Sequence, residues 1–162
     1  SGNADACKQL AGYYADGVCG MQQDMAKATE LWLKAGELGC AEGYHKLGNS
    51  YYAGGGVEID KKKAKHYWEL AAMKGDVDAR YNLGCMEGRA GNHERTYKHM
   101  IIAARAGHPE SLDSVKTGFM KGYVTKYEYE STLRAHHECQ AEMKSETRDK
   151  AADLMAQHQA AS

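Results

Sequence analysis

The sequence predicts an all-α protein, a right-handed α-α superhelix (solenoid) of about four helix-turn-helix units with an extended C-terminal helix. The first observation is a motif that recurs 36 residues later, with Asp, Ala, Trp, Ala and Gly at the same offsets in residues 24–39 and 60–75. A fixed period of this size is typical of stacked helical repeats. The second is composition: one Pro in 162 residues leaves long stretches free to be helical, and 18 Gly can separate them.

The second helix of each unit is predicted from its two ends. Each begins at a residue whose side-chain oxygen can cap free backbone N–H groups, at Asp24, Asp60, Asn92 and Thr125. Fifteen residues after the first three caps a glycine recurs, at Gly39, Gly75 and Gly107, where a helix end favours a left-handed conformation. Thr125 is followed three residues later by Glu128, the spacing of a capping box. These repeated starts and stops define one second helix per unit.

The first helix of each unit is predicted from a small residue that stands four positions before a large one. The large residues are Leu10, Leu47, Leu83 and Val115, and the small ones are Ala6, Gly43, Ala79 and Ser111. This spacing indicates a packed helix face. An aromatic residue continues the face in three units, and Glu87 is the exception in the third. Trp32 and Trp68, on the second helices, are expected to fill the space between units.

These positions resemble the Sel-1-like repeat (SLR) family of tetratricopeptide-like α-solenoid proteins. Unit two matches the family pattern nearly throughout, in Gly43, Leu47, Gly48, Tyr51, Gly54, Gly56, Val57, Asp60, Ala64, Trp68, Ala71, Ala72 and Gly75. Unit one departs at Ala11 and Gly36, unit three keeps "ARYNLG" and "AARAGH" with a shorter loop, and unit four is degenerate. The tail "LRAHHECQAEMKSETRDKAA" resembles the C-termini of algal SLR proteins, some of which carry an upstream zinc finger; this chain contains no such finger.

The domain organisation follows from these alignments. We expect residues 1–3 to be a tag scar or leader, with the natural N-terminus missing, and residues 4–141 to form a single SLR solenoid domain. Its units are about 4–40, 41–76, 77–108 and 109–141, and residues 142–162 form a C-terminal capping or extension helix. In that last segment Ala151, Leu154 and Met155 make a small apolar stripe. The stripe is predicted to fold back as a cap, with a restart at Ser145 if the helix bends; docking on another molecule is the alternative.

The resemblance implies adaptor or scaffold work, in which the stacked first helices line a groove that holds a partner peptide or protein. The four large residues of the first helices align this chain with the family, and that alignment gives the positions expected to face the groove. They are Lys8, Glu42, His45, Asn49, Tyr52, Asp78, Tyr81, Asp113 and Thr117. Polar and aromatic side chains at such positions suggest a contact surface. A solvated helix face is the alternative for any one of them, and their mixed chemistry names no ligand.

The alternative function is an enzyme or metal-binding helical domain that uses the "HHEC" segment. His136 and Cys139 lie three apart on one predicted helix and could share a metal ion with Glu142 or Met143. A structural zinc site needs four ligands at recognisable spacing, and the sequence has no Cys-x₂-Cys pair. The five cysteines also lack a local nucleophile signature. We therefore predict no catalytic residue, no metal site and no cofactor.

Charge and cysteine usage bound the partners and the compartment. Lys and Arg number 21 against 22 Asp and Glu, so nothing favours nucleic acid or an anionic membrane as a partner. No apolar run reaches the length of a membrane span. The five cysteines do not recur from unit to unit, which fits reduced thiols and a cytoplasmic or nuclear location. A monomer is favoured.

Overall fold

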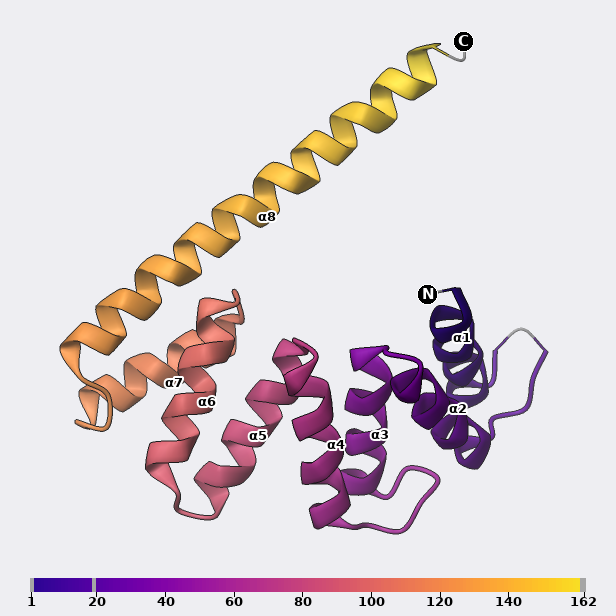
Figure 1. Cartoon of the computed structure of the whole chain (residues 1–162), viewed down its shortest axis with the longest axis horizontal. Coiled ribbons are helices and arrows are strands. Elements are labelled where there is room, and N and C mark those ends of the chain that lie inside the picture. The colour runs from indigo at the N-terminus through magenta and orange to yellow at the C-terminus, as the bar shows by residue number, and fades with distance from the viewer. Residues whose placement is uncertain (1, 19, 161–162) are drawn as a thin grey trace. The chain divides into compact units, whose positions relative to one another are not determined.

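The chain is helical throughout the part that the structure describes. The structure is a computed structural model that describes residues 2–18 and 20–160, without the side chains of residues 152 and 155–160. The described residues form eight helices and no strand (Figure 1), which confirms the predicted all-α class of helix pairs. The helices are α1 (Gly2–Asp16), α2 (Met25–Glu37), α3 (Ala41–Ala53), α4 (Lys61–Met73), α5 (Val77–Arg89), α6 (His93–Arg105), α7 (Pro109–Met120) and α8 (Lys126–Ala160). The expectations for Ser1, for the thiol of Cys19, for the side chain of Met155 and for residues 161–162 lie outside the described residues.

Contacts divide the chain into two compact units, Ser1–Thr96 and Tyr97–Ser162. The boundary falls inside α6, between Thr96 and Tyr97, after the first four residues of that helix. The sequence predicts repeats and one solenoid domain, and it does not predict this division.

Two of the predicted helix starts in the first compact unit are confirmed, and both are aspartates. Asp24 Oδ1 accepts a hydrogen bond of 3.0 Å from the backbone N–H of Lys27. Asp60 Oδ1 accepts bonds of 2.9 and 3.0 Å from the backbone N–H groups of Lys62 and Lys63. These bonds satisfy donors that have no partner inside the helix, so they fix where α2 and α4 begin.

The other two predicted caps differ from each other. Thr125 and Glu128 form the predicted capping box, because Glu128 Oε2 accepts from the Thr125 N–H at 2.8 Å and Thr125 Oγ1 accepts from the Glu128 N–H at 3.2 Å. Asn92 does precede α6, but its side-chain amide donates to Glu87 Oε2 at 2.7 Å. The predicted helix stops are confirmed, since Gly39, Gly75 and Gly107 have φ values of 101°, 92° and 89°.

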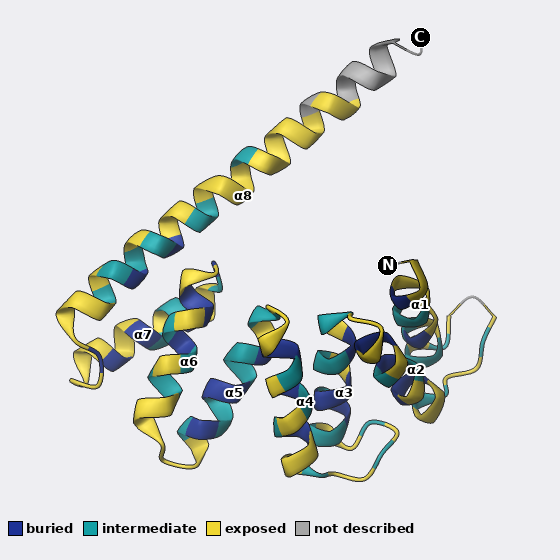
Figure 2. Ribbon diagram, viewed as in Figure 1, coloured by how far each residue is buried: buried dark blue, intermediate teal, exposed yellow. Residues whose placement is uncertain are grey.

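The core of the first unit is built where neighbouring helices meet. One cluster joins α4 to α5 and contains Ala64, Trp68, Ala71, Ala72, Ala79 and Leu83. The other joins α1, α2 and α3 and contains Ala11, Ala28, Trp32 and Leu47. Trp68 is only 4% exposed and packs against residues of α3 and α5, which confirms that it fills the space between successive units. Figure 2 shows the buried residues along the facing sides of these helices.

The alignment of the first helix is wrong by one residue in unit one. The sequence alignment pairs Leu10 with Leu47, yet Leu10 is 36% exposed. Ala11, which is 36 residues before Leu47, is fully buried. Gly12 then matches Gly48. The larger side chain of Leu10 drew the alignment toward it, whereas close packing of α1 against its neighbours places the small residue inward.

The second compact unit, which begins at Tyr97, contains the end of α6 together with α7 and α8. His136 on α8 is buried, and its Nδ1–H donates to the carbonyl of Ala104 at 2.8 Å. Gln140 Nε2 donates to the carbonyl of Gly107 at 2.9 Å. The Ala104 carbonyl lies in the last turn of α6 and also accepts from the backbone N–H of Gly107 at 3.0 Å, and Gly107 follows the helix. The side chains of α8 thus bind carbonyl groups at and just after the end of α6.

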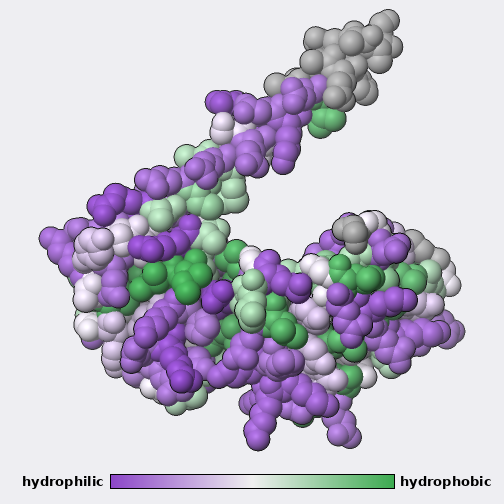
Figure 3. Space-filling model, viewed as in Figure 1, coloured by the Kyte–Doolittle hydropathy of each residue, from purple (hydrophilic) through white to green (hydrophobic). Residues whose placement is uncertain are grey.

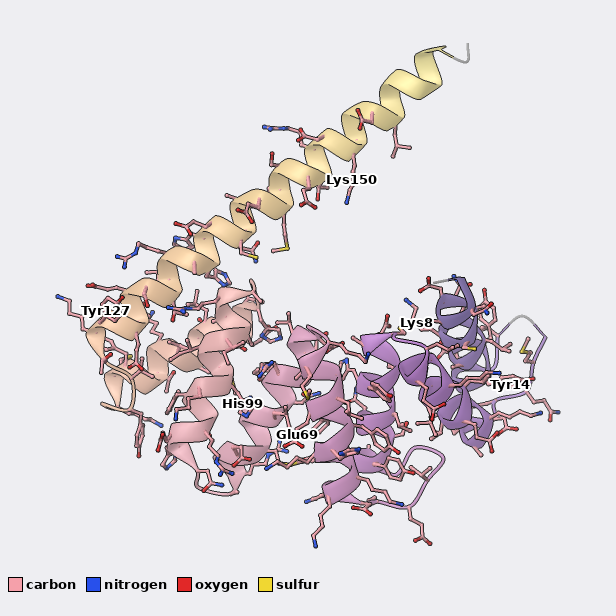
Figure 4. All side chains as sticks on the ribbon, viewed as in Figure 1. Lys8, Tyr14, Glu69, His99, Tyr127 and Lys150 are labelled. Atoms are coloured by element: carbon pink, nitrogen blue, oxygen red, sulfur yellow. The ribbon has the colours of Figure 1, made fainter. Side chains whose placement is uncertain are left out.

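After Gln140, α8 continues as one helix whose residues, where their burial is described, are exposed apart from Ser145. It runs without a break from Lys126 to Ala160, so the predicted bend near Lys144 and restart at Ser145 are absent and the tail does not fold back over the last unit. Figure 2 shows exposed residues along this part, and Figure 3 shows them to be largely hydrophilic. Described interactions within this part include the ion pair of Lys150 with Glu146 at 3.8 Å (Lys150 is labelled in Figure 4). In the described part of the chain, no helix combines the length and the apolar character that crossing a membrane requires.

Removing residues 145–162 is therefore expected to leave the melting temperature of the chain unchanged. Apart from Ser145, the removed residues whose burial is described are exposed, so their loss uncovers little apolar surface. Thermal unfolding followed by circular dichroism would measure the effect. A lower melting temperature in the shortened chain would show that the tail does stabilise the solenoid.

Candidate functional site

A hollow of the first compact unit lies between α3 and α5. It has a volume of about 420 Å³ and is lined by Asn49, Tyr52, Ala53, Trp68, Tyr81, Asn82, Cys85, Met86 and Arg89. Trp68 reaches it from α4, because Gly48 on α3 has no side chain to block the indole: a Cβ atom at Gly48 would lie 2.6 Å from Trp68 Nε1. One glycine thus lets the tryptophan of the second helix reach the surface formed by the first helices.

A hydrogen-bond network connects α3, α4 and α5 at this hollow. Asn49 Oδ1 accepts from the indole N–H of Trp68 at 2.9 Å and from Asn82 Nδ2 at 3.3 Å. His45 Nε2 lies 3.2 Å from Asn49 Nδ2 and 3.3 Å from Asn82 Nδ2. Because amide nitrogens only donate, Nε2 accepts, and the neutral ring of His45 carries its proton on Nδ1. That nitrogen faces Asp76 Oδ1 at 3.5 Å.

The network fixes which way each amide points. Since the Trp68 indole can only donate, the oxygen of Asn49 must face it and the nitrogen of Asn49 must face His45. Among the described residues no bond to Asn82 Oδ1 is present, although Asn82 lines the hollow. The hollow therefore contains an oriented amide pair with an acceptor that is available to a bound group.

The aromatic end of the hollow is surrounded by cations. The ring of Tyr52 lies 5.2 Å from the ring of Trp68, with an angle of 38° between the planes. Lys61 Nζ lies 5.7 Å and Arg89 Cζ 5.8 Å from the centre of the Tyr52 ring. Arg89 also donates a hydrogen bond to the Tyr52 hydroxyl.

A second hollow of about 430 Å³ lies one repeat earlier, between α1 and α3. It is lined by Lys8, Gly12, Ala15, Asp16, Met25, Trp32, Glu42 and Lys46. Trp32, which stands 36 residues before Trp68, lines this hollow as Trp68 lines the later one. Lys8, labelled in Figure 4, forms an ion pair with Glu42 across it at 3.0 Å, and this hydrogen bond raises the pKa of Lys8. The hollow is thus a repeating feature, lined by different side chains in each copy.

The structure brings six of the nine predicted groove residues to these two hollows. His45, Asn49, Tyr52 and Tyr81 line or support the later one, and Lys8 and Glu42 line the earlier one. Asp78 is exposed near the start of α5 and lines neither. Asp113 and Thr117 are exposed on α7 in the other compact unit, where Thr117 Oγ1 donates to the Asp113 carbonyl at 3.0 Å. A partner-binding role for all nine stays a prediction.

Sequence reasoning missed Asn82 and Arg89 and gave Trp68 only a packing role. Asn82 directly precedes Leu83, which marks the packed face, so the spacing does not place Asn82 among the groove positions. A signal was available at Trp68, because a buried indole N–H needs an acceptor and a polar residue on a facing helix must supply it.

The segment "HHEC" has a structural role in the second unit. His136 uses its Nδ1–H on the Ala104 carbonyl, and Cys139 is half-buried with its sulfur close to Gly107. Among the described side chains, no group of three or more His, Cys, Asp and Glu is placed to hold a metal ion. The segment thus gives no geometric support to the metal-binding alternative.

Solved structures with the same arrangement of helices are Sel1-type repeat proteins. The crystal structure of a Sel1 repeat protein from Oxalobacter formigenes matches with a TM-score of 0.70 at 24% identity, over 83% of this chain and 58% of that one. The structure of c5321, a protective antigen of uropathogenic Escherichia coli strains that displays an SLR fold, matches with a TM-score of 0.69 at 21% identity, over 85% of this chain and 31% of that one. These similarities show the fold, an all-helical superhelix.

Curated relatives and a family model match the sequence itself. The ERAD-associated E3 ubiquitin-protein ligase component HRD3B of Arabidopsis thaliana is 32% identical over 101 residues, which are 60% of this chain. Component HRD3A of the same plant is 27% identical over 113 residues, or 70% of this chain. The chain spans only 15% of the length of either relative. The Sel1 repeat model matches residues 4–40, 41–76 and 77–108, and the chain therefore belongs to the Sel1 repeat family.

Proposed function

We propose that this chain is a protein–protein interaction module, an adaptor or scaffold, that holds an extended segment of a partner protein in the groove lined by its first helices. The observation that carries the proposal is the hollow between α3 and α5, where aromatic rings and oriented amides meet. The two curated relatives are named as components of a ubiquitin ligase, and a repeat domain that joins proteins together is consistent with such a part. The identity of their partners does not carry over to so short a chain.

The chemistry of the hollow suits a peptide. Tyr52 and Met86 are half-buried and, with the small exposed part of Trp68, offer an apolar surface to a partner side chain. Aromatic residues are enriched where protein interfaces bury such groups. An extended peptide also carries backbone N–H and C=O groups that need partners when water is displaced. Asn82 Oδ1 can accept from such an N–H group, and the free N–H of Asn49 can donate to a C=O group. No catalytic role is proposed, because none of these groups is a nucleophile with a neighbouring base.

A blocking substitution tests the groove without removing any packing. Ala53 is exposed and lines the hollow, so Ala53→Trp places an indole where the partner segment would lie. Ala26 on α2 is also exposed but lines neither hollow, so Ala26→Trp is the matched control. A phage-displayed library of random peptides would be selected on the parent chain, and the selected peptides would then be tested on both variants.

The expected result is a set of peptides whose binding weakens at least about tenfold on Ala53→Trp and stays unchanged on Ala26→Trp. Both variants are expected to keep the melting temperature of the parent chain. If no peptide is selected, or if the selected peptides bind Ala53→Trp as well as the parent, the proposed groove is wrong.

We also propose that the chain works in a reducing compartment, the cytoplasm or the nucleus, as a monomer that binds neither nucleic acid nor membrane. The described cysteines Cys7, Cys40, Cys85 and Cys139 are all unpaired, which supports reduced thiols. Thiol titration of protein from its native source, denatured without reductant, is expected to find all five cysteines reactive. Two missing thiols would mean a disulfide and would contradict this location.

A further inference from the structure

Two cations lie against Tyr52, which lines the hollow between α3 and α5: Arg89, which also lines the hollow, and Lys61. Lys61 and Arg89 both lie against the ring of Tyr52, and both side chains are exposed. Among the described residues neither of them forms an ion pair with Asp or Glu. Two like charges placed around one ring repel each other, and a bound anion would relieve that repulsion.

The nearest acidic residue of α5 is already engaged elsewhere. Glu87 precedes Arg89 by two residues, but it is only 4% exposed and faces the interior. It accepts from Lys65 Nζ at 2.5 Å and from Asn92 Nδ2 at 2.7 Å. Arg95 is its further cationic neighbour, at 4.0 Å. The charge of Glu87 is therefore balanced by other residues, and Arg89 keeps N–H donors for an incoming group.

The pair of cations is a feature of this hollow and does not occur at the equivalent hollow one repeat earlier. At the equivalent positions 36 residues earlier, the first hollow has Asp16 in place of Tyr52 and Met25 in place of Lys61. Ala53 stands at the position that corresponds to Arg89. The first hollow thus presents a carboxylate where the second presents a tyrosine between two cations. An acidic partner residue would be attracted to the second hollow and repelled from that place in the first.

We propose that the second hollow selects partner segments that carry an Asp or Glu side chain, which binds Arg89 and Lys61 beside Tyr52 while an adjacent apolar side chain of the partner covers Trp68. The proposal rests on the proposed function, since it names the chemistry of the segment that the groove holds. Arg89 is suited to this contact because a planar guanidinium can donate two parallel hydrogen bonds to one carboxylate. Lys61 adds a second positive charge that is free to move toward the ligand.

The test uses the peptides selected from the phage library and compares their sequences. Peptides selected on the parent chain are expected to share Asp or Glu at a fixed distance from an apolar residue. Selection on the double variant Lys61→Gln/Arg89→Gln is expected to lose that preference. The matched control, Lys62→Gln/Lys74→Gln, removes the same charge from two exposed lysines of the same region that do not contact Tyr52, and it is expected to keep the preference.

The binding affinities of one selected peptide for the parent chain and its variants then show whether Lys61 and Arg89 contact the acidic residue of the peptide. Replacing its shared Glu or Asp by Gln or Asn is expected to weaken binding to the parent about tenfold and to leave binding to Lys61→Gln/Arg89→Gln unchanged. In the charge-reversed variant Arg89→Glu, a peptide with Lys at the shared position is expected to bind better than the original peptide.

The outcomes separate this inference from the proposed function. Peptides that Ala53→Trp blocks but that share no acidic residue would support the groove and overturn the acid preference. A shared acidic residue whose removal weakens binding equally on the parent and on Lys61→Gln/Arg89→Gln would place its contact elsewhere and also overturn it. If no selected peptide is blocked by Ala53→Trp, the groove itself fails and the preference with it.

Discussion

Gly48→Ala is expected to destabilise the first unit by about 2 kcal/mol, although the substitution adds a single methyl group to a helix. The new Cβ would lie 2.6 Å from Trp68 Nε1 and 3.0 Å from Trp68 Cγ. The indole cannot move away easily, because it is 4% exposed and its N–H is bound to Asn49. The gain of about 1 kcal/mol in helix propensity offsets only part of this overlap.

The equivalent change one repeat earlier should have the opposite sign. A Cβ atom at Gly12 meets nothing within 4 Å, so Gly12→Ala keeps only the propensity gain and is expected to stabilise by about 0.5 to 1 kcal/mol. Urea unfolding followed by tryptophan fluorescence measures both, because Trp32 and Trp68 are the only tryptophans and both lie in the first unit. Equal effects of the two substitutions would show that Trp68 does not seat against Gly48.

Glu87→Ala is expected to cost about 3 kcal/mol, more than any exposed charge in the chain. Glu87 replaces the aromatic residue that other units carry, and its carboxylate holds Lys65 of α4 and Asn92 of the α5–α6 turn. Removal leaves both donors without their acceptor and opens a space in the interior. Glu69→Ala, an exposed change on α4 (Glu69 is labelled in Figure 4), is the control and should have little effect.

The same carboxylate should make stability depend on pH. Hydrogen bonds from Lys65, first, and from Asn92 lower the pKa of Glu87 below its usual value of 4.5. Because the folded pKa is the lower one, its contribution is fully present above the pKa of the unfolded chain and is lost as the pH falls through the folded value. Unfolding free energies measured from pH 6 downward should therefore fall less steeply in Glu87→Gln than in the parent. An identical slope in both proteins would mean that the carboxylate is not held as described.

Features that depend on a few neighbouring residues could be predicted from the sequence. The caps at Asp24 and Asp60 and the reciprocal pair of Thr125 and Glu128 close hydrogen bonds over two or three residues, so their spacing is enough to identify them. The alignment of α1 failed at Leu10, because which face of a helix is buried depends on its neighbours. The prediction that the tail folds back as a cap failed for a related reason, since α8 is one continuous helix. An apolar stripe predicts that some surface will pack against it, but it does not tell whether the same chain supplies that surface.

The sequence by itself determined the repeats, the helix ends and the family, because each is written in residue types at fixed short spacings. Only the tertiary structure decided how the candidate site is assembled. Asn49, Trp68 and Asn82 come from three helices, and Asn82 is 33 residues from Asn49 along the chain. Their bonds depend on how closely those helices approach, which Gly48 permits, and no local spacing encodes that approach. The same holds for Lys61 and Arg89, whose shared position at Tyr52 exists only once α3, α4 and α5 are packed.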